Sequence, residues 1–275
     1  MLKKFAIFLF FIACFGFFSR VYLLNTSGKY SFGPQRVAHA GGAIEGHTYT
    51  NSYEALSKNY SRGFRYFELD FSLTADGHIV CIHDWNESFT ELFGAGSKFE
   101  SCTMPGLARW MRDHPAASIV TDIKSINHFG WTEVDVLGEI FDKLSYSKSR
   151  VIPQLYFPEN YNAIKEIGYK SIIWTLYRYE GANEEVISWV KELDGNLAVA
   201  MPKDRARTAL PARLREMDVP TYVHTVNSLR STAHFLHKRR VSNIYTDHIP
   251  PSYIDLTLIT NKWRRFQKET LLHRL

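Results

Sequence analysis

The sequence predicts a (β/α)₈ barrel preceded by an N-terminal hydrophobic segment. From Gln35 onward, short β-rich runs alternate with segments of helical period, a pattern typical of a parallel sheet covered by helices. Nine such β-rich runs occur, and one of them returns from a turn too tight for a parallel crossover, which leaves eight parallel strands. The length that remains after the hydrophobic segment suits a barrel of about 250 residues.

The expected strands are distributed along the chain up to residue 247. They are 36–41, 66–74, 79–84, 118–124, 151–156, 171–177, 196–201, 222–227 and 243–247, with helical stretches at 132–144, 184–193, 205–217 and 229–238. Asp76-Gly77 is a strong signal for a two-residue hairpin, so strand 79–84 is expected to return antiparallel along strand 66–74 as an insertion after strand two. In that register Asp70 faces His83.

The composition is that of one globular domain, with 45% hydrophobic and 22% charged residues. The net charge is +5, but the basic residues are spread along the chain and gather only at 237–240 and 262–265. Such a modest excess fits an anionic substrate or a membrane surface equally well, and we expect no nucleic-acid partner.

Residues 1–24 are expected to be a signal peptide or an N-terminal transmembrane anchor. Lys3-Lys4 precede an apolar run from Phe5 to Phe18, which reaches bilayer-spanning length once residues 21–24 are added. The absence of an Ala-x-Ala cleavage site favours a membrane anchor with an exported, periplasmic or extracellular, catalytic domain; secretion after cleavage is the alternative. Residues 25–34 are expected to be a connector and 35–275 the barrel domain.

Cys81 and Cys102 are the only cysteines outside the N-terminal segment and so the only possible disulfide pair of an exported domain. We expect both to be buried thiols.

Polar residues end several otherwise apolar strands, and the carboxyl ends of the strands build the active site of such a barrel. Three acids, two histidines and a lysine are expected to meet there: Glu68, Asp70, Asp122, His39, His83 and Lys124. The acids would repel one another if left unpaired, so a hard divalent cation, Mg²⁺ or Ca²⁺, is expected among them. The two histidines suit an acid and a base on either side of a metal-bound phosphate.

Between about Val37 and Pro250 the chain resembles the glycerophosphodiester phosphodiesterase family. The motifs that carry the resemblance are Ala38-His39-Ala40-Gly41, Asn51-Ser52-Tyr53-Glu54-Ala55, Gly63 through Glu68-x-Asp70, Thr74-x-Asp76-Gly77, His83-Asp84, Thr121-Asp122-Ile123-Lys124, His224-Thr225-Val226-Asn227 and Ile244-Tyr245-Thr246-Asp247. The resemblance implies that His39 and His83 are the catalytic pair, that Glu68, Asp70 and Asp122 bind the metal, and that Lys124 contacts substrate. It also implies attack by a neighbouring substrate hydroxyl and a cyclic phosphate intermediate.

Four motifs depart from the family pattern, at five positions. Ala40 stands where the family has arginine, Thr50-Asn51-Ser52 replaces Glu-Asn-Thr, Asp122 replaces a glutamate, and His224 replaces a tryptophan. The departures at Ala40, at Thr50-Asn51-Ser52 and at His224 put a small glycerophosphodiester substrate in question more than the reaction itself. The shorter third acid, Asp122, does not argue against a metal, because a shorter acid at this position also occurs in the related phospholipase D toxins. Besides Lys124, the expected substrate contacts are Asn51, His224 and Trp174, with a core-capping role left open for His224.

The leading hypothesis is a metal-dependent phosphodiesterase that hydrolyses a glycerophosphodiester-type bond in a lipid head group or an envelope glycerol-phosphate polymer. One alternative is a phospholipase D-like enzyme acting on lipid head groups. Another is a non-catalytic barrel that binds a phosphorylated ligand, which the loss of the arginine at Ala40 suggests and the retention of both histidines and all three acids opposes.

Overall fold

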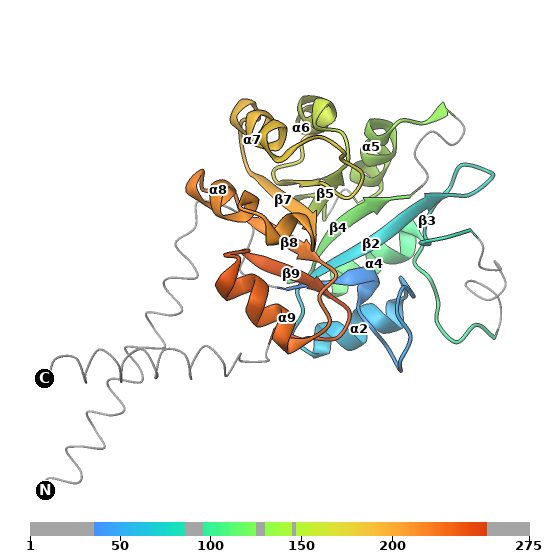
Figure 1. Ribbon diagram of the computed structural model, residues 1–275. Helices are drawn as coiled ribbons and strands as arrows, with labels where there is room; N and C mark the ends of the chain where they lie inside the picture. The colour runs from blue at the N-terminus through green and yellow to red at the C-terminus, as the bar shows by residue number, and fades with distance from the viewer. Residues whose placement is uncertain (1–35, 86–95, 125–129, 145–146, 252–275) are drawn as a thin grey trace, which may run out of the picture. The chain divides into compact units, whose positions relative to one another are not determined.

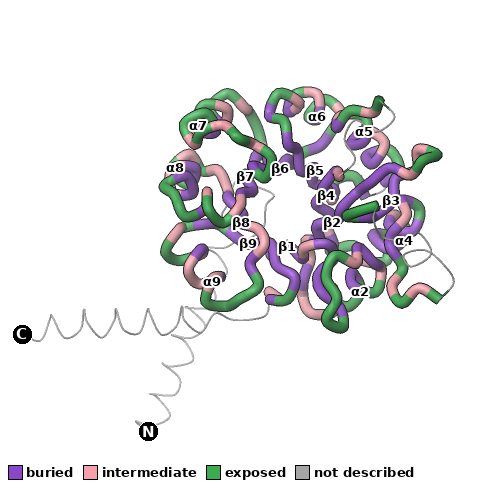
Figure 2. Tube along the Cα trace, turned by 45° about the vertical axis from the view of Figure 1, so that its right-hand side comes forward, coloured by how far each residue is buried: buried purple, intermediate pink, exposed green. Residues whose placement is uncertain are grey.

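The protein forms a closed barrel of parallel strands surrounded by helices (Figure 1). The computed structural model describes residues 36–85, 96–124, 130–144 and 147–251. Within them the strand order is β1-β9-β8-β7-β6-β5-β4-β2-β3, and a further pairing of β1 with β2 closes the ring. Figure 2 shows the strands as an inner ring with the helices outside it. The predicted (β/α)₈ barrel is therefore confirmed.

The strands are short, and all pair in parallel except β2 with β3. They are β1 (Val37–Ala38), β2 (Tyr66–Leu73), β3 (Ile79–Cys81), β4 (Ser118–Ile123), β5 (Val151–Leu155), β6 (Ile172–Thr175), β7 (Leu197–Pro202), β8 (Thr221–His224) and β9 (Asn243–Thr246). The main helices are α2 (Tyr53–Ser61), α4 (Met104–Asp113), α5 (Glu133–Lys143), α6 (Tyr161–Ile167), α7 (Asn183–Glu192), α8 (Leu210–Glu216) and α9 (Leu229–Ala233).

Side-chain capping fixes where helices begin. The Ser52 hydroxyl accepts a hydrogen bond from the Ala55 backbone at the start of α2. At the start of α5, Thr132 and Asp135 bond reciprocally in a capping box. Both contacts satisfy backbone N–H groups that have no partner within the first turn of a helix.

Alternation along β2 separates the core from the active site. Phe67, Leu69 and Phe71 are fully buried in the apolar cluster, and the ring of Phe67 packs 5.5 Å from that of Trp110 in α4. Because successive side chains of a strand point to opposite faces, Glu68 and Asp70 point toward the barrel axis.

The hairpin between β2 and β3 differs from the prediction by one residue. Phe71 pairs with Cys81 and Leu73 with Ile79, so Asp70 does not face His83. The Thr74 backbone N–H donates to His78 and that of Gly77 donates to Thr74, which makes a three-residue loop with Gly77 at φ 81°. This loop is a turn followed by a left-handed residue, and it contains one residue more than the two-residue turn that Asp76-Gly77 predicts.

Cys81 and Cys102 form a buried disulfide, so the expectation of two free thiols is wrong. The segment before α4 runs back along β3: the Cys81 N–H donates to the Cys102 carbonyl at 2.8 Å, and Val80 bridges to Thr103. A pairing across a sequence separation of 21 residues leaves no periodic signal in the sequence.

None of the helices in the described ranges combines the length and apolar character needed to cross a membrane. The predicted N-terminal segment 1–24 and connector 25–34 lie outside those ranges, so the division of the chain into three parts stays a prediction.

Candidate active site

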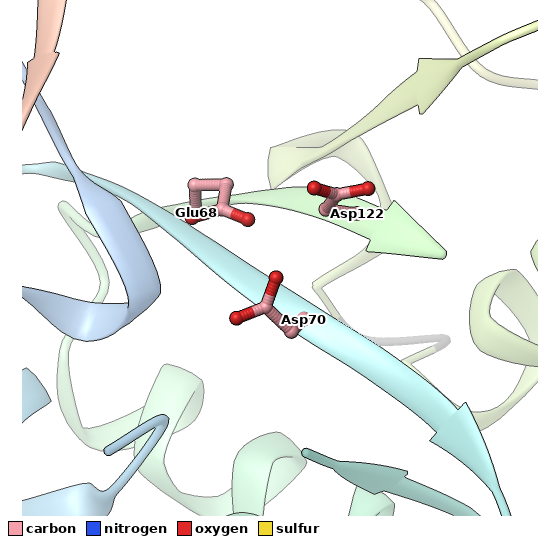
Figure 3. Close-up of side chains that lie close together, drawn as sticks. All are labelled: Glu68, Asp70 and Asp122. Atoms are coloured by element: carbon pink, nitrogen blue, oxygen red, sulfur yellow. The ribbon is translucent and has the colours of Figure 1, made fainter. Parts of the chain in front are cut away.

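Three buried carboxylates meet at the barrel mouth. Glu68 and Asp70 lie on β2, and Asp122 lies on β4, where it pairs in register with Asp70 (Figure 3). One oxygen from each carboxylate lies within 4.8 Å of the others. The structure thus brings together the three residues predicted as metal ligands.

Lys124 lies between two of the acids. Its Nζ is 2.8 Å from Asp122 Oδ2 and 3.0 Å from Asp70 Oδ1. Burial opposes the charge on Lys124, but the two carboxylates outweigh it and raise the pKa of the amine above its usual range. Burial likewise opposes the charge on Asp122, yet Lys124 and a hydrogen bond from the Tyr156 hydroxyl lower the pKa of Asp122.

The carboxylate oxygens of Glu68 and Asp70 that make no hydrogen bond are suited to bind a cation. Glu68 Oε2 accepts a hydrogen bond from the Ala40 backbone at 2.7 Å, whereas Glu68 Oε1 has no hydrogen-bond partner among the described residues. Asp70 Oδ1 makes no hydrogen bond either, although the Lys124 amine lies close to it. Burial and the neighbouring Asp70 charge raise the pKa of Glu68 to about 8. Buried carboxylate oxygens left in this state fit a hard divalent cation such as Mg²⁺ or Ca²⁺.

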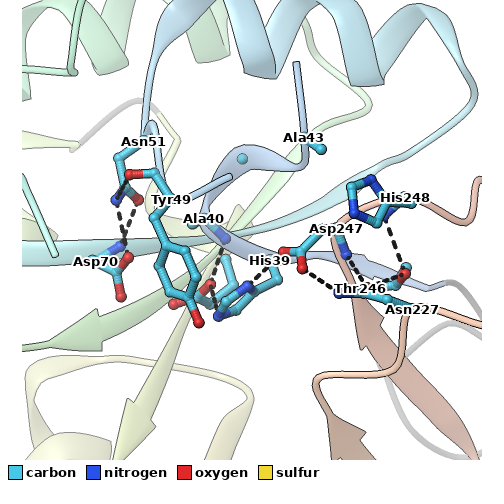
Figure 4. Close-up of polar contacts among 12 residues, drawn as sticks. His39, Ala40, Ala43, Tyr49, Asn51, Asp70, Asn227, Thr246, Asp247 and His248 are labelled. Carbon is cyan, nitrogen blue, oxygen red and sulfur yellow. Dashed lines mark hydrogen bonds and ion pairs between the residues drawn. The ribbon is translucent and has the colours of Figure 1, made fainter. Parts of the chain in front are cut away.

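Asn51 holds Asp70 in place. Its Nδ2 donates to Asp70 Oδ2 at 2.9 Å, and its Oδ1 accepts from the Asp70 backbone N–H at 3.0 Å (Figure 4). With only 1% of its surface exposed, Asn51 does not line the active-site cavity. The structure thus places Asn51 against Asp70, outside the cavity lining, and its predicted contact with substrate stays a prediction.

His39 follows β1 and is oriented by an acid from the last strand. Its Nδ1 lies 2.8 Å from Asp247 Oδ1, which leaves Nε2 facing Glu68 Oε2 at 4.0 Å (Figure 4). Burial lowers the pKa of His39, but the hydrogen bond to Asp247 and the charge of Glu68 outweigh burial and raise it to about 9. Asn227 in turn binds Asp247, donating from Nδ2 and accepting from the Asp247 N–H at 2.9 Å.

The catalytic candidates share one cavity of about 210 Å³. His39, His83 and Lys124 line it, together with Glu68 and Asp122. Further lining residues are uncharged and come from β5 to β9 or the segments that directly follow these strands: Gln154, Tyr156, Thr175, Tyr177, Pro202, His224, Thr225 and Tyr245. The cavity thus combines charged groups suited to a phosphate with neutral groups suited to the rest of a ligand.

His224 ends β8 among the neutral groups of the cavity. Its Nε2 is buried without a hydrogen-bond partner among the described residues, while the rings of Tyr177 and Tyr245 lie 5.5 and 6.0 Å from its imidazole. Burial and the charge of His39 lower the pKa of His224 to about 4, so its imidazole is neutral at pH 7. An unpartnered polar atom on a cavity wall is a ready contact for a ligand.

Trp174 does not line the cavity. It is fully buried in the core cluster, with its ring 5.1 Å from that of Tyr179, whereas the next residue of β6, Thr175, faces the cavity. The structure therefore does not support Trp174 as a substrate contact. Along the run 171–177 the polar residues Ser171, Thr175 and Tyr177 share one face, so the alternation in the sequence already indicated that Trp174 lies on the opposite, apolar face.

Residues 42–158 match the family model described as the glycerophosphoryl diester phosphodiesterase family. This segment belongs to that family. The resemblance expected from the motifs is thereby confirmed, and it places the chain among the phosphoric diester hydrolases. No curated protein matches the chain significantly.

Solved structures share the barrel at low sequence identity. A glycerophosphodiester phosphodiesterase from Parabacteroides distasonis aligns with a TM-score of 0.62 and 15% identity over 83% of this chain and 97% of its own. A glycerophosphodiester phosphodiesterase from Thermotoga maritima aligns with a TM-score of 0.52 and 18% identity, over 77% of this chain and 93% of its own. A phosphodiesterase from Oleispira antarctica, in complex with the product sn-glycerol-3-phosphate, gives 0.60 and 14% over 79% and 94%. At these identities the likeness establishes the fold.

Three further residues of the site were not predicted. Asp247 ends the last strand and touches His39 because β1 pairs with β9 in the closed barrel. Tyr156 donates its hydroxyl to Asp122 from the neighbouring strand's end. Tyr49 packs its ring against both His39 and His83, the two histidines predicted to be catalytic. The position of Asp247 and Tyr156 at strand ends was a signal in the sequence; nothing comparable marked Tyr49.

Proposed function

We propose that the protein is a metal-dependent phosphodiesterase that cleaves a glycerophosphodiester-type bond by acid–base catalysis with His39 and His83. The observation that carries this proposal is the convergence of both imidazoles, the three carboxylates and Lys124 around one cavity. Glu68, Asp70 and Asp122 would hold a divalent cation, Mg²⁺ or Ca²⁺, which would supply charge neutralisation for the phosphate.

The two histidines move protons in opposite directions. A hydroxyl next to the phosphate attacks phosphorus and gives its proton to one imidazole, while the other imidazole protonates the departing alkoxide oxygen. A new P–O bond forms and the bond to the leaving group breaks, which gives a cyclic phosphate and an alcohol. Water then opens the ring with the proton transfers reversed. Each acid or base contributes about 10²–10⁴-fold to the rate.

The substrate is proposed to be a glycerol-phosphate diester from a lipid head group or an envelope polymer. The Oleispira antarctica neighbour, which contains sn-glycerol-3-phosphate, supports this class. The wall that carries His224 is uncharged and polar, which suits a hydroxylated leaving group. Because Ala40 provides no positive charge beside His39, Lys124 and the bound cation would neutralise the negative charge of the phosphate.

We also propose that the domain works outside the cytoplasm, anchored through residues 1–24. The Cys81–Cys102 disulfide supports an oxidising compartment, since such bonds persist mainly in exported proteins. Proteolysis of spheroplasts, from which any outer envelope has been removed, tests this: cleavage of the domain without lysis of the inner membrane is expected, and protection until that membrane is lysed would contradict it.

The direct test of the enzyme is hydrolysis of glycerophosphodiesters by residues 35–275 with and without Ca²⁺ or Mg²⁺, beside His39→Ala and His83→Ala. Metal-dependent turnover that both variants lose would support the proposal. Binding of glycerol 3-phosphate without any turnover would instead favour a non-catalytic barrel. Release of a free head-group alcohol together with a phosphatidic or cyclic lipid product would favour the phospholipase D-like alternative.

A further inference from the structure

Tyr49 lies between the two catalytic histidines. Its ring centroid is 4.7 Å from that of His39 and 4.7 Å from that of His83, with interplanar angles of 85° and 70°. Both contacts are edge-to-face arrangements, a favourable geometry for aromatic rings. Figure 4 shows the Tyr49 ring directly beside the His39 imidazole. One side chain therefore touches both proton-transfer groups of the site.

The two histidines differ in what else holds them. His39 is oriented through Nδ1 by Asp247. His83 follows β3 in an exposed position, and within the described part of the chain its ring makes no hydrogen bond or ion pair. Tyr49 is thus the contact that relates the His83 imidazole to His39.

The backbone at Tyr49 is held in an unusual conformation. Its φ is 59°, in the left-handed region that a bulky side chain rarely adopts, and Asn51 follows at φ 49°. The Asn51 N–H donates to the Ala40 carbonyl at 3.2 Å, and its side chain reaches the Tyr49 carbonyl at 3.4 Å. Residues in such conformations cluster where the surrounding structure enforces a functional geometry. Here Asn51 fixes Tyr49 as well as Asp70.

We propose that Tyr49 is a positioning residue of the reaction: its ring sets the separation and orientation of the His39 and His83 imidazoles. This inference rests on the proposed acid–base function of the pair. The aromatic ring is the part of Tyr49 that acts, because the ring, and not the hydroxyl, makes both contacts.

Kinetics on two substrates can distinguish a misplaced acid–base pair from general damage to the active site. Glycerophosphocholine releases an alkoxide that needs a proton from the acid, whereas the p-nitrophenyl ester of glycerol phosphate uses the same nucleophile but releases a weakly basic phenolate. Misplacing the acid therefore slows the first substrate far more than the second. We expect Tyr49→Leu to lower kcat for glycerophosphocholine about 10²-fold and to lower the ratio of the two kcat values at least tenfold, with KM little changed.

Tyr49→Phe keeps the ring and is expected to stay within about threefold of the wild type on both substrates. Phe157→Ala removes an exposed aromatic residue that lies outside the cavity and serves as the matched control, with activity unchanged. Equal losses on both substrates in Tyr49→Leu, a rise in KM alone, or a loss in Tyr49→Phe as large as in Tyr49→Leu would overturn the positioning role.

An NMR measurement of the imidazole protons makes the test independent of catalytic activity and also reports whether the variant is folded. The Tyr49 ring shifts the His39 and His83 signals in the wild type, and Tyr49→Leu is expected to move both, whereas Tyr49→Phe leaves them near their original values. Unchanged His83 signals in a folded Tyr49→Leu variant would refute the contact. If that variant does not fold, Tyr49→Ala takes its place, and unchanged His83 signals together with a wild-type ratio of the two kcat values in Tyr49→Ala would refute it. A wild type without turnover would reject the proposed function, while the NMR comparison would still decide the role of Tyr49.

Discussion

The Nδ1 atom of His39 and the Oδ1 atom of Asp247 lie 2.8 Å apart although 208 positions separate the two residues in the chain. They meet because Ala38 in β1 pairs with Thr246 in β9. Asp247 fixes which imidazole nitrogen faces the cavity and stabilises the protonated ring, as acidic partners of catalytic histidines do.

Asp247→Asn is therefore expected to lower kcat about 10²-fold with little change in KM, because the imidazole loses its charged partner but the substrate contacts remain. The amide can still bond to Asn227, so the melting temperature should stay close to that of the wild type. Steady-state kinetics and thermal melting check this. A pure KM effect would show that Asp247 acts on substrate and not through His39.

Chelation is expected to abolish turnover and to lower the melting temperature, and Ca²⁺ or Mg²⁺ to restore both. A cation bound only by the folded protein stabilises it by about 2.7 kcal/mol at 100 times its dissociation constant. Glu68→Gln should remove this metal-dependent shift, because the glutamate offers one of the two unpartnered oxygens. Identical melting curves with and without cation in the wild type would contradict the metal site.

Lys124→Met should abolish activity and reduce stability by about 3 kcal/mol without metal, because Asp70 and Asp122 lose the cation they share. Added Ca²⁺ or Mg²⁺ should recover more stability in this variant than in the wild type, since the metal would then neutralise both acids. Lys148→Met is a matched control, because Lys148 contacts the Phe141 ring away from the cavity. An equal metal response in Lys124→Met and wild type would show that Lys124 and the cation act independently.

His224→Phe should leave the melting temperature unchanged or raise it, because the variant removes a buried nitrogen that has no partner among the described residues. We expect KM for a hydroxylated diester to rise about tenfold in the same variant, since the ligand loses a hydrogen bond. Kinetics on two diesters with different leaving groups and thermal melting measure both effects. A lower melting temperature with unchanged KM would make His224 a core-capping residue.

Removing the disulfide by Cys81→Ala with Cys102→Ala should lower the free energy of unfolding by about 3 kcal/mol, the chain-entropy cost of a loop of this length. Because His83 lies two residues beyond Cys81, loss of the disulfide should also loosen the segment that holds His83. Turnover of the double variant should therefore fall even at temperatures at which the whole population is still folded. Denaturant titration with and without reductant gives the energy. If reductant lowered the stability of the double variant as much as that of the wild type, the loss of stability could not be assigned to the Cys81–Cys102 disulfide.

The general plan of the fold was predictable because the strands are short, apolar and separated by helical periods. The hairpin register was not, because Asp76-Gly77 also fits a loop one residue longer, and only the Thr74–His78 pairing distinguishes the two. Helix α6 has only seven residues, too few to give a clear apolar stripe.

In the site, the metal ligands were predictable from charge repulsion and strand ends, and the structure brings them together. Asn51 and Trp174 were predicted to contact the substrate, but neither is among the residues that line the cavity. The side chain of Asn51 lies behind Asp70 because the loop adopts left-handed backbone angles, which composition and spacing do not show. For Trp174, by contrast, the spacing held the answer, because Thr175 and Tyr177 share the polar face of the strand and Trp174 lies on the other face.

Because the first strand, β1, pairs with the last strand, β9, the contact between His39 and Asp247 can form only late in the synthesis of the chain. His39 is among the first residues of the folded domain to be made, whereas its partner Asp247 is among the last. A growing chain, or a fragment cut before β9, holds all three carboxylates and both histidines but lacks the acid that orients His39. The proposed acid–base pair would therefore be complete only once translation has reached the residue after β9.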